Sequence, residues 1–322
     1  MTDQPRHPVV AVVGPTATGK SDLALDLAER LGGEIVNADA MQLYRGMDIG
    51  TAKLPVAERR GIRHHELDVL DVTEEATIAR YQAAARADLD AIRVRGHVPV
   101  LVGGSGLYVR AALDHLEIPP TDPAVRADLE DEAERFGGAA MFARLRAADP
   151  EAARRIQPAN VRRVVRALEV VQLTGRPFSA TMPTRRFLEP TVLLGLRVDR
   201  PVLYERIAAR VDRMWDDGML AEVETLLPRG LRGGVTASRA IGYRQAIDVL
   251  EGSMSRDEAV AETVAATRRY ARRQESWFRP DPRISWLDAT DDADRARLLA
   301  TALARTEATP GQHAPTGTGA RG

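Results

Sequence analysis

A complete P-loop pattern, G-x-x-x-x-G-K-[ST], occurs near the start of the chain as Gly14-Pro15-Thr16-Ala17-Thr18-Gly19-Lys20-Ser21. Lys20 is one of only two lysines, and all other basic residues are arginine. In such a turn the backbone N–H groups surround an anion, the lysine adds a positive charge, and the serine hydroxyl can ligate Mg²⁺. The motif therefore predicts binding of a phosphorylated ligand. It leaves open whether that ligand is ATP.

Two other polar side chains could take part in chemistry. Asp39 follows the apolar run 34–38, where a carboxylate could ligate a metal or accept a proton from a nucleophile. Ser105 follows Gly103-Gly104, a pair that allows the backbone to approach a ligand closely while the hydroxyl donates a hydrogen bond. Each residue could equally be an ordinary turn or cap residue, so neither signal is specific when taken alone.

The first third of the chain alternates apolar runs with segments of helical periodicity. Predicted strands are 9–13, 34–38, a short one near 66–69, and 98–102; predicted helices are 22–31 and 78–95. This alternation predicts an α/β fold, a doubly wound parallel sheet like that of P-loop NTPases. Ligands of such sheets bind beyond the carboxyl ends of the strands, so we expect the P-loop, Asp39 and the 103–105 turn to converge.

Beyond about residue 117 the alternation stops, and four helices follow without a strand between them. We predict a P-loop core made of residues 1–116 and 189–290, interrupted by a helical insertion at 117–188. Within the second part of the core, a strand is expected at 191–198, long helices at 201–227 and 256–278, and a last strand at 283–287. One more helix can follow 288, and the Pro- and Gly-rich residues 306–322 predict a disordered tail.

Composition limits the class of protein. Apolar residues make up 44% and charged residues 28%, there is no cysteine, and no run approaches the roughly 20 apolar residues of a membrane span. These features exclude disulfides and thiolate chemistry and favour a cytoplasmic protein without membrane association. The six histidines are too scattered for a metal cage, and the pair His64-His65 is expected in a loop or at a strand edge.

The net charge of −1 hides a segregation of charges. Residues 143–190 contain ten arginines and four acidic residues, and residues 263–283 contain six arginines and two acidic residues. Such blocks are typical of a surface that binds a polyanion, but solvated helix faces produce the same pattern. Composition alone does not separate the two.

The motifs taken together resemble those of the tRNA dimethylallyltransferases of bacteria, enzymes that prenylate the adenine next to the anticodon. The resemblance extends in order from about residue 9 to 287. It is carried by GPTATGKS (14–21), NADAMQLYRGMDIGTAK (37–53), LVGGSGLYVRA (101–111), ANVRRVVRALEV (159–170), RAIGYRQ (239–245) and TRRYARRQESWFR (267–279). The run from DAMQLY to GTAK and the GG-[ST]-x-LY pattern are far more specific than the P-loop.

The resemblance implies a role for particular residues. Asp39 would accept the proton of the adenine amine, while Lys20, the P-loop amides and an Mg²⁺ on Ser21 would hold the diphosphate of dimethylallyl diphosphate. Arg244 would neutralise the leaving pyrophosphate, and Ser105 stands where the family usually has threonine. Contacts with the tRNA anticodon stem-loop are implied for Asp39, Ala40, Met41, Gln42, Ser105, Arg126, Arg162, Arg163, Arg166 and Arg239. We expect the enzyme to act as a monomer.

Three alternatives remain at this point. A small-molecule or nucleotide kinase would share the P-loop, although no aspartate follows the strand 98–102 at the usual metal-ligand position. An adenylate prenyltransferase would carry out the same chemistry on a free nucleotide. A P-loop RNA-binding protein would use the basic blocks without catalysis.

Overall fold

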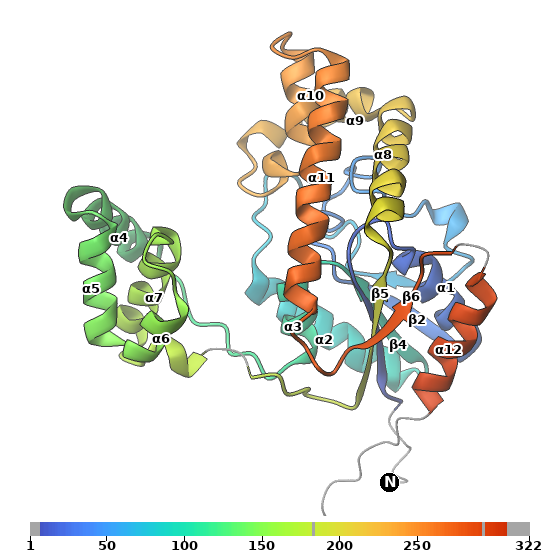
Figure 1. Cartoon of the computed structure of the whole chain (residues 1–322), viewed down its shortest axis with the longest axis horizontal. Helices are drawn as coiled ribbons and strands as arrows, with labels where there is room; N and C mark the ends of the chain where they lie inside the picture. Colours follow the sequence, from blue (N-terminus) through green and yellow to red (C-terminus); the bar gives the residue numbers. More distant parts are fainter. Residues whose placement is uncertain (1–6, 182–183, 292–293, 308–322) are drawn as a thin grey trace, which may run out of the picture. The chain divides into compact units, whose positions relative to one another are not determined.

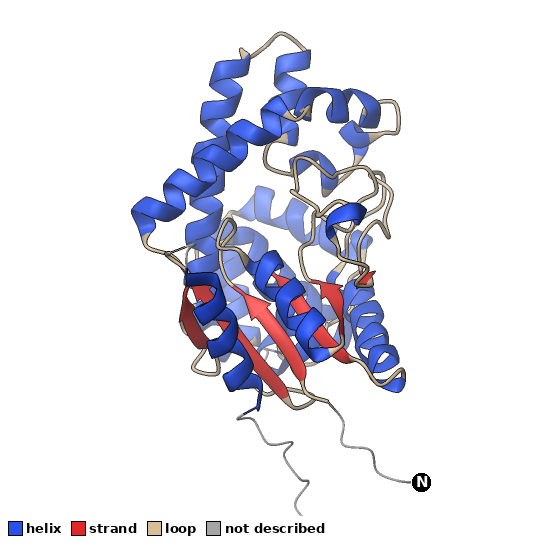
Figure 2. Ribbon diagram, turned by 90° about the vertical axis from the view of Figure 1, so that its right-hand side faces the viewer, coloured by secondary structure: helices blue, strands red, loops and turns tan. Residues whose placement is uncertain are grey.

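The computed structural model describes residues 7–181, 184–291 and 294–307 of the chain. Its centre is a six-stranded sheet in the order β3-β2-β4-β1-β5-β6, in which all neighbouring strands are parallel (Figures 1 and 2). The strands are β1 (Val9–Val13), β2 (Gly33–Asn37), β3 (His64–His65), β4 (Val98–Gly103), β5 (Thr191–Arg197) and β6 (Ser285–Asp288). This arrangement confirms the predicted α/β fold with a doubly wound parallel sheet.

The sheet is buried on both faces. Val10 and Val12 pack with α1 (Lys20–Leu31) and α12 (Arg295–Glu307) in the main hydrophobic core. The alternate residues of β1, Val9, Ala11 and Val13, point to the opposite face and are buried as well. Helix α2 (Ile78–Val94) contacts β2 and β4, and α3 (Gly106–Leu113) packs against α2. A continuous apolar strand is therefore what this position requires.

Helices from the second half of the chain extend beyond the carboxyl ends of the strands. They are α8 (Arg200–Asp216), α9 (Met219–Leu226), α10 (Tyr243–Leu250) and α11 (Arg256–Phe278), and α8 and α11 pack side by side (Figure 1). The prediction of one helix over 201–227 was wrong, because Gly218 adopts a left-handed conformation with φ 111° and separates α8 from α9. The eight-residue helices α3 and α10 were not predicted.

The predicted strand near 66–69 was also wrong by a few residues. The paired residues are His64 and His65, which form the edge strand β3. Glu66 and Asp68 have φ angles of 57° and 58°, and this left-handed backbone cannot continue a strand. The expected strand-edge position of the two histidines is confirmed.

Residues 114–186 form a second compact unit, separate from the unit of residues 1–113 and 187–322. It begins three residues before, and ends two residues before, the predicted insertion at 117–188. Its helices are α4 (Pro123–Phe136), α5 (Gly138–Ala148), α6 (Pro150–Arg155) and α7 (Val161–Thr174). They bury a core of their own that includes Leu129, Leu145 and Leu168, and Asp122 caps α4 as its side chain accepts from the Ala124 amide at 2.8 Å.

Helix α12 is the helix expected after residue 288, and it extends to Glu307. The first two residues of the predicted tail, 306 and 307, are therefore helical, and residues 308–322 lie outside the described residues. Among the described residues, no helix has both the length and the apolar character needed to cross a membrane.

Candidate active site

A cavity of about 250 Å³ lies at the carboxyl ends of the central strands. Three strand-end loops contribute Thr16, Asp39 and Ser105, as the parallel sheet predicts. The remaining wall comes from the loop after β2, from α8, from the segment before α10 and from α11. These elements add Ala40, Met41, Gly50, Thr51, Arg210, Val211, Met214, Arg239, Ala240, Ile241, Thr263, Thr267, Tyr270 and Arg273.

The P-loop has the conformation that its glycines allow. Gly14 and Gly19 have φ angles of 139° and 82°, and a Cβ on Gly14 would lie 2.6 Å from the Leu196 carbonyl oxygen. Thr18 donates its hydroxyl proton to the Pro15 carbonyl oxygen at 2.9 Å, and Lys20 donates to the same oxygen. Lys20 opens α1, so the amide groups of the turn and of the helix N-terminus face the same space.

The surroundings of Lys20 lower the pKa of its side-chain amine. Burial and, to a lesser extent, the nearby Arg210 guanidinium lower the pKa of Lys20 to about 7, and Asp39 partly opposes both effects. An amine with this pKa is only partly charged near neutrality, so an anion placed beside it would draw a proton onto it. The lysine side chain does not line the cavity itself, but it lies close to Asp39 and Arg210, which do.

Asp39 is held in place by Asn37. The Asp39 amide donates to Asn37 Oδ1 at 3.0 Å, and Asn37 Nδ2 donates to the carbonyl oxygens of Asp39 and Glu66 at 3.0 and 2.9 Å. One carboxylate oxygen, Oδ1, accepts from the Met41 amide at 3.0 Å. In the described part of the chain Oδ2 has no hydrogen-bond partner, so one oxygen remains available to a proton or a ligand.

Ser105 reaches the same wall through a close approach of backbones. A Cβ on Gly103 would lie 2.3 Å from the Ala38 carbonyl oxygen, so only glycine allows β4 to end so near β2. Ser105 Oγ accepts from the Ala40 amide at 3.4 Å. Burial raises the pKa of Tyr270 to about 12, and the side chains of Ser105 and Gln274 lie within hydrogen-bonding reach of its hydroxyl. A neutral phenol thus stands next to the serine.

Arg210 was missed by the sequence interpretation. It lies on α8, on the face that also carries Leu203, Ile207 and Val211, and its half-buried side chain lines the cavity near Lys20 and Asp39. Burial lowers the pKa of Arg210 and Asp39 opposes the shift, yet an arginine keeps its charge under these conditions. The signal in the sequence was an arginine at helical spacing within an apolar stripe, a position that a cation occupies only with a functional or structural reason.

Arg244 is not brought to the cavity. It lies on α10 with 63% of its side chain exposed, its Nη2 is 3.1 Å from Glu262 Oε1, and its Nε is 3.8 Å from Asp248 Oδ2. Gln42 is also absent from the cavity wall, since its Nε2 donates to the Thr51 carbonyl oxygen at 3.1 Å. Ala40, Met41 and Arg239 do line the cavity.

Four arginines proposed for tRNA contact lie in the helical unit, and they fall into two kinds. Arg126 and Arg166 both bind the buried Glu169, at 2.8 Å each, and Arg166 also donates to the Pro119 and Pro120 carbonyl oxygens. Arg162 and Arg163 are exposed at the start of α7, and the described residues provide no acidic partner for them. The first pair has a structural task within the unit, whereas the second pair is free to bind phosphate.

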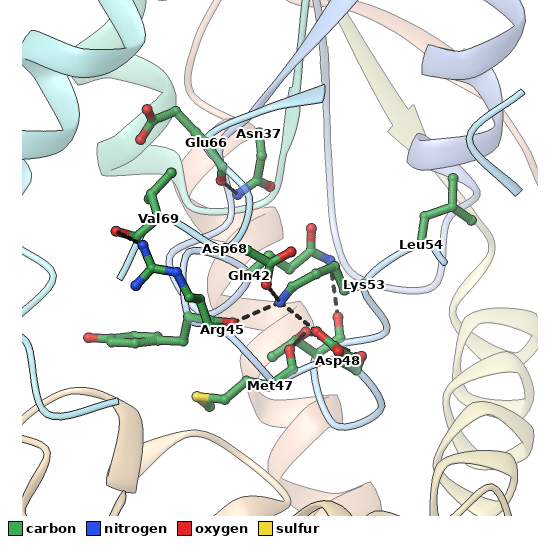
Figure 3. A network of polar contacts seen from close by, with 12 residues as sticks. Asn37, Gln42, Arg45, Met47, Asp48, Lys53, Leu54, Glu66, Asp68 and Val69 are labelled. Carbon is green, nitrogen blue, oxygen red and sulfur yellow. Dashed lines mark hydrogen bonds and ion pairs between the residues drawn. The ribbon is translucent and has the colours of Figure 1, made fainter. Parts of the chain in front are cut away.

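The second lysine, Lys53, supports the loop that follows β2 (Figure 3). Its Nζ lies 2.7 Å from the Tyr44 carbonyl oxygen, 2.6 Å from Asp48 Oδ1 and 2.5 Å from Asp68 Oδ1, and only 2% of the side chain is exposed. The loop carries Met41 and Thr51 into the cavity wall. Lys53 is therefore a structural residue, a role that the sequence interpretation did not assign.

Glu222 of α9 holds the same loop from the other side. Its carboxylate accepts from the amides of residues 48, 49 and 50 at 2.9, 2.7 and 3.1 Å, and from the Tyr243 hydroxyl at 2.6 Å. This hydroxyl is buried, and both burial and the adjacent Glu222 raise the pKa of Tyr243 well above its usual range. The loop is thus fixed to α9 by hydrogen bonds, and Gly50 also packs against the Tyr243 ring of α10.

The fold and the cavity define a class: α/β proteins with a P-loop and a carboxylate at one cavity beyond the strand ends. Comparison with known families then gives the particular member of this class. The model of the IPP transferase family matches residues 42–281 of the chain. The chain belongs to the IPP transferase family, and it is a prenyltransferase enzyme.

Curated relatives and solved structures agree with this assignment. The chain is 58% identical to a tRNA dimethylallyltransferase of Streptomyces coelicolor over 95% of its own length and 98% of the relative, and 60% identical to one of a Nocardioides species over 90% and 95%. It is similar to the tRNA isopentenylpyrophosphate transferase of Bacillus halodurans, with a TM-score of 0.68 and 39% identity over 94% of this chain and 97% of that one. A eukaryotic dimethylallyltransferase acting on tRNA gives a TM-score of 0.81 and 28% identity over 95% and 81%. The family resemblance inferred from the motifs is confirmed, and the kinase alternative is set aside.

Proposed function

We propose that this enzyme transfers a dimethylallyl group from dimethylallyl diphosphate to the exocyclic amine of the adenine at position 37 of tRNAs, next to the anticodon, and releases pyrophosphate. The observation that carries the proposal is the meeting of a P-loop, two half-buried cations and a carboxylate with a free oxygen around one cavity. The relatives named as tRNA dimethylallyltransferases support the same substrate pair.

The donor diphosphate is expected between the P-loop amides, Lys20 and Arg210. As the allylic carbon–oxygen bond breaks, positive charge develops on the allylic carbon and negative charge on the leaving pyrophosphate. Groups that stabilise the leaving anion therefore accelerate the step most. Arg210 takes over the role that the family resemblance suggested for Arg244, because Arg210 lines the cavity and Arg244 does not.

The acceptor amine is expected at Asp39. The adenine amine attacks the allylic carbon through its nitrogen lone pair, and the proton that it loses goes to the free Oδ2 of Asp39. Val211, Met214 and Ile241 provide an apolar part of the wall for the methyl groups of the prenyl chain. Ser105, which lies beside Asp39 at the same wall, can donate a hydrogen bond to the base.

A Mg²⁺ ion fits this arrangement with Ser21 as its protein ligand. The Ser21 hydroxyl is exposed in the first turn of α1 and takes no partner among the described residues. Magnesium usually keeps several waters and binds through substrate phosphates and few protein groups, so one hydroxyl is sufficient. When bound, the ion would offset the charge of the diphosphate.

The acceptor is proposed to be an anticodon stem-loop rather than free AMP. An adenine in a loop can be unstacked at a cost of a few kcal/mol, whereas a base-paired adenine hides its amine. Phosphate contacts that orient such a loop are available from the exposed Arg162 and Arg163, and Arg239 and Arg273 supply positive charge at the cavity. We also propose that the enzyme acts as a monomer.

The experiment offers radiolabelled dimethylallyl diphosphate to the purified enzyme with Mg²⁺ and one of two acceptors, an anticodon stem-loop containing A37 or AMP. We expect label in the stem-loop, little label in AMP, and loss of turnover with retained RNA binding in Asp39→Asn. A preference for AMP would contradict the tRNA assignment. Transfer of a γ-phosphate from ATP without prenyl transfer would contradict the reaction itself.

A further inference from the structure

Gln274 of α11 connects two loops that are far apart in the sequence. Its Oε1 accepts from the Thr16 amide of the P-loop at 2.9 Å, and its Nε2 donates to the Gly104 carbonyl oxygen at 3.0 Å. The side chain is 5% exposed. A single buried amide thus satisfies one polar group of the P-loop and one of the loop that carries Ser105.

The backbone of both loops packs closely against the Gln274 side chain. A Cβ on Gly104 would lie 2.0 Å from Gln274 Nε2 and 3.1 Å from the Gly14 carbonyl oxygen, so the two loops and the glutamine are in direct contact. One turn earlier on α11, Tyr270 lines the cavity and lies within hydrogen-bonding reach of both Ser105 and Gln274. Helix α11 therefore contacts both loops at one point, through Gln274 and the neighbouring Tyr270.

The two loops hold different halves of the proposed reaction. The P-loop is the expected cradle of the donor diphosphate, and Ser105 stands beside Asp39 at the expected place of the acceptor base. Because the Thr16 amide is occupied by Gln274, it is not available to an anion and serves as an attachment point. The bridge through Gln274 spans the gap across which the new carbon–nitrogen bond must form.

We propose that Gln274 is a positioning residue that sets the distance between the donor cradle and the acceptor loop, and so aligns the allylic carbon with the adenine amine. This inference rests on the proposed function. Loss of the bridge should slow the chemical step more than it weakens either substrate. A misplacement of about 1 Å costs on the order of 10²-fold in rate in comparable cases.

The first test replaces the amide by a side chain that cannot bridge. In Gln274→Met we expect the single-turnover rate at saturating substrates to fall on the order of 10²-fold, while the Kd for dimethylallyl diphosphate and for the stem-loop changes by less than about fivefold. Gln245→Met is the matched control. Gln245 is also 5% exposed and bonded at both ends of its amide, to the Gly242 amide and to Glu262, but it lies away from the P-loop. Its rate should stay within about threefold of the unmodified enzyme.

The second test uses the similarity of a protonated carboxyl to a primary amide. In Gln274→Glu the carbonyl oxygen can still accept from the Thr16 amide, but only the protonated form can donate to the Gly104 carbonyl oxygen. The rate of this variant divided by that of the unmodified enzyme should therefore rise as the pH falls from about 9 to about 6, since burial shifts a carboxyl pKa upward into this range. The titratable or charged groups around this position are Lys20, Asp39, Arg210, Tyr270 and Arg273, and dividing by the rate of the unmodified enzyme at each pH removes the pH dependence that the two enzymes share.

Three results would overturn the inference: a Gln274→Met rate within about threefold of the unmodified enzyme, an equal loss in Gln245→Met, or a Gln274→Glu rate as low as that of Gln274→Met at every pH. Each of these leaves the unmodified enzyme active. Failure of the proposed function would instead appear as absence of prenylated RNA with the unmodified enzyme, so the two failures are distinguishable.

Discussion

The charged residues at the cavity influence the pKa values of Lys20 and Arg210. Lys20 and Arg210 are half-buried cations that lie near each other, and Asp39 partly compensates both. Two like charges in one buried place are costly unless an anion joins them. The site is therefore prepared for a ligand that brings more negative charge than Asp39 supplies, which a diphosphate does.

A first prediction concerns proton uptake by Lys20. Its pKa is about 7 in the free protein, and a bound diphosphate should raise it. Above pH 7 the free amine is mostly neutral, so binding of dimethylallyl diphosphate without RNA should take up a proton, and affinity should fall as the pH rises. Titration calorimetry in two buffers of different ionisation enthalpy measures this uptake. Lys20→Met should abolish it, and a buffer-independent enthalpy for the unmodified enzyme would contradict the assignment.

A second prediction separates the two candidate arginines. Arg210→Met should lower the single-turnover rate by about 10²- to 10³-fold, the usual effect of removing one group that stabilises a developing anion. Arg244→Met should stay within about threefold, because its exposed ion pairs with Glu262 and Asp248 are worth little. The reverse order of effects would return the leaving-group role to Arg244.

At the scale of elements, the conformation of the loop after β2 depends on the residues that bind it. Lys53, Glu222 and Tyr243 bind its backbone and side chains from two sides, and Gly50 passes directly over the Tyr243 ring. The loop in turn brings Met41 and Thr51 to the cavity. Its shape is therefore a property of the packed helices α9 and α10 as much as of its own sequence.

A third prediction follows for Gly50. A Cβ there would lie 2.5 Å from Tyr243 Cε2, so Gly50→Ala should reduce the free energy of unfolding by about 1–3 kcal/mol, as overpacking does. Gly233→Ala is the control, because a Cβ at Gly233 meets nothing within 4 Å. Urea denaturation of both variants measures the difference. Equal stability of the two would show that the ring moves aside without cost.

The elements also show what could be predicted from sequence. The strands 9–13 and 98–102 are continuous apolar runs, and the topology of parallel sheets then places Asp39 and Ser105 near the P-loop without further information. Arg210 could not be placed in this way, because its burial depends on how α8 packs against α11. The break at Gly218 was missed because a single glycine inside a helical pattern is often tolerated. Arg244 was placed by motif likeness alone, and packing of α10 turned it to solvent.

At the scale of the whole molecule, the chain divides into two compact units, each with its own core. In the helical unit, burial alone would raise the pKa of Glu169, but Arg126 and Arg166 outweigh it and hold this pKa below its usual value. The ion pairs therefore stabilise the unit above the unfolded-state pKa, and this stabilisation is lost as the pH falls through the lower folded-state pKa. Arg162 and Arg163, which we propose for RNA binding, take no part in these ion pairs.

A fourth prediction tests whether Arg162 and Arg163 bind RNA without contributing to the chemical step. The double variant Arg162→Gln with Arg163→Gln should weaken stem-loop binding and lower the slope of log Kd against log salt by about 1–2, with the single-turnover rate at saturating RNA unchanged. Arg154→Gln is the control, since Arg154 is exposed on α6 and paired with Glu151. Filter binding over a series of salt concentrations measures the slope. An unchanged slope would place the RNA elsewhere.

Because the chain has only two lysines, a reagent that modifies amines has few side chains to choose from. Of its two side-chain amines, Lys53 is buried and surrounded by three oxygens, whereas Lys20 has a pKa of about 7 and is largely an unprotonated nucleophile in mild base. An acylating reagent should therefore modify Lys20 in preference to Lys53, and dimethylallyl diphosphate should protect it, as peptide mass spectrometry would report. Equal labelling of Lys53 would contradict this selectivity. A covalent probe can therefore be attached to Lys20, next to the cavity, without an engineered residue.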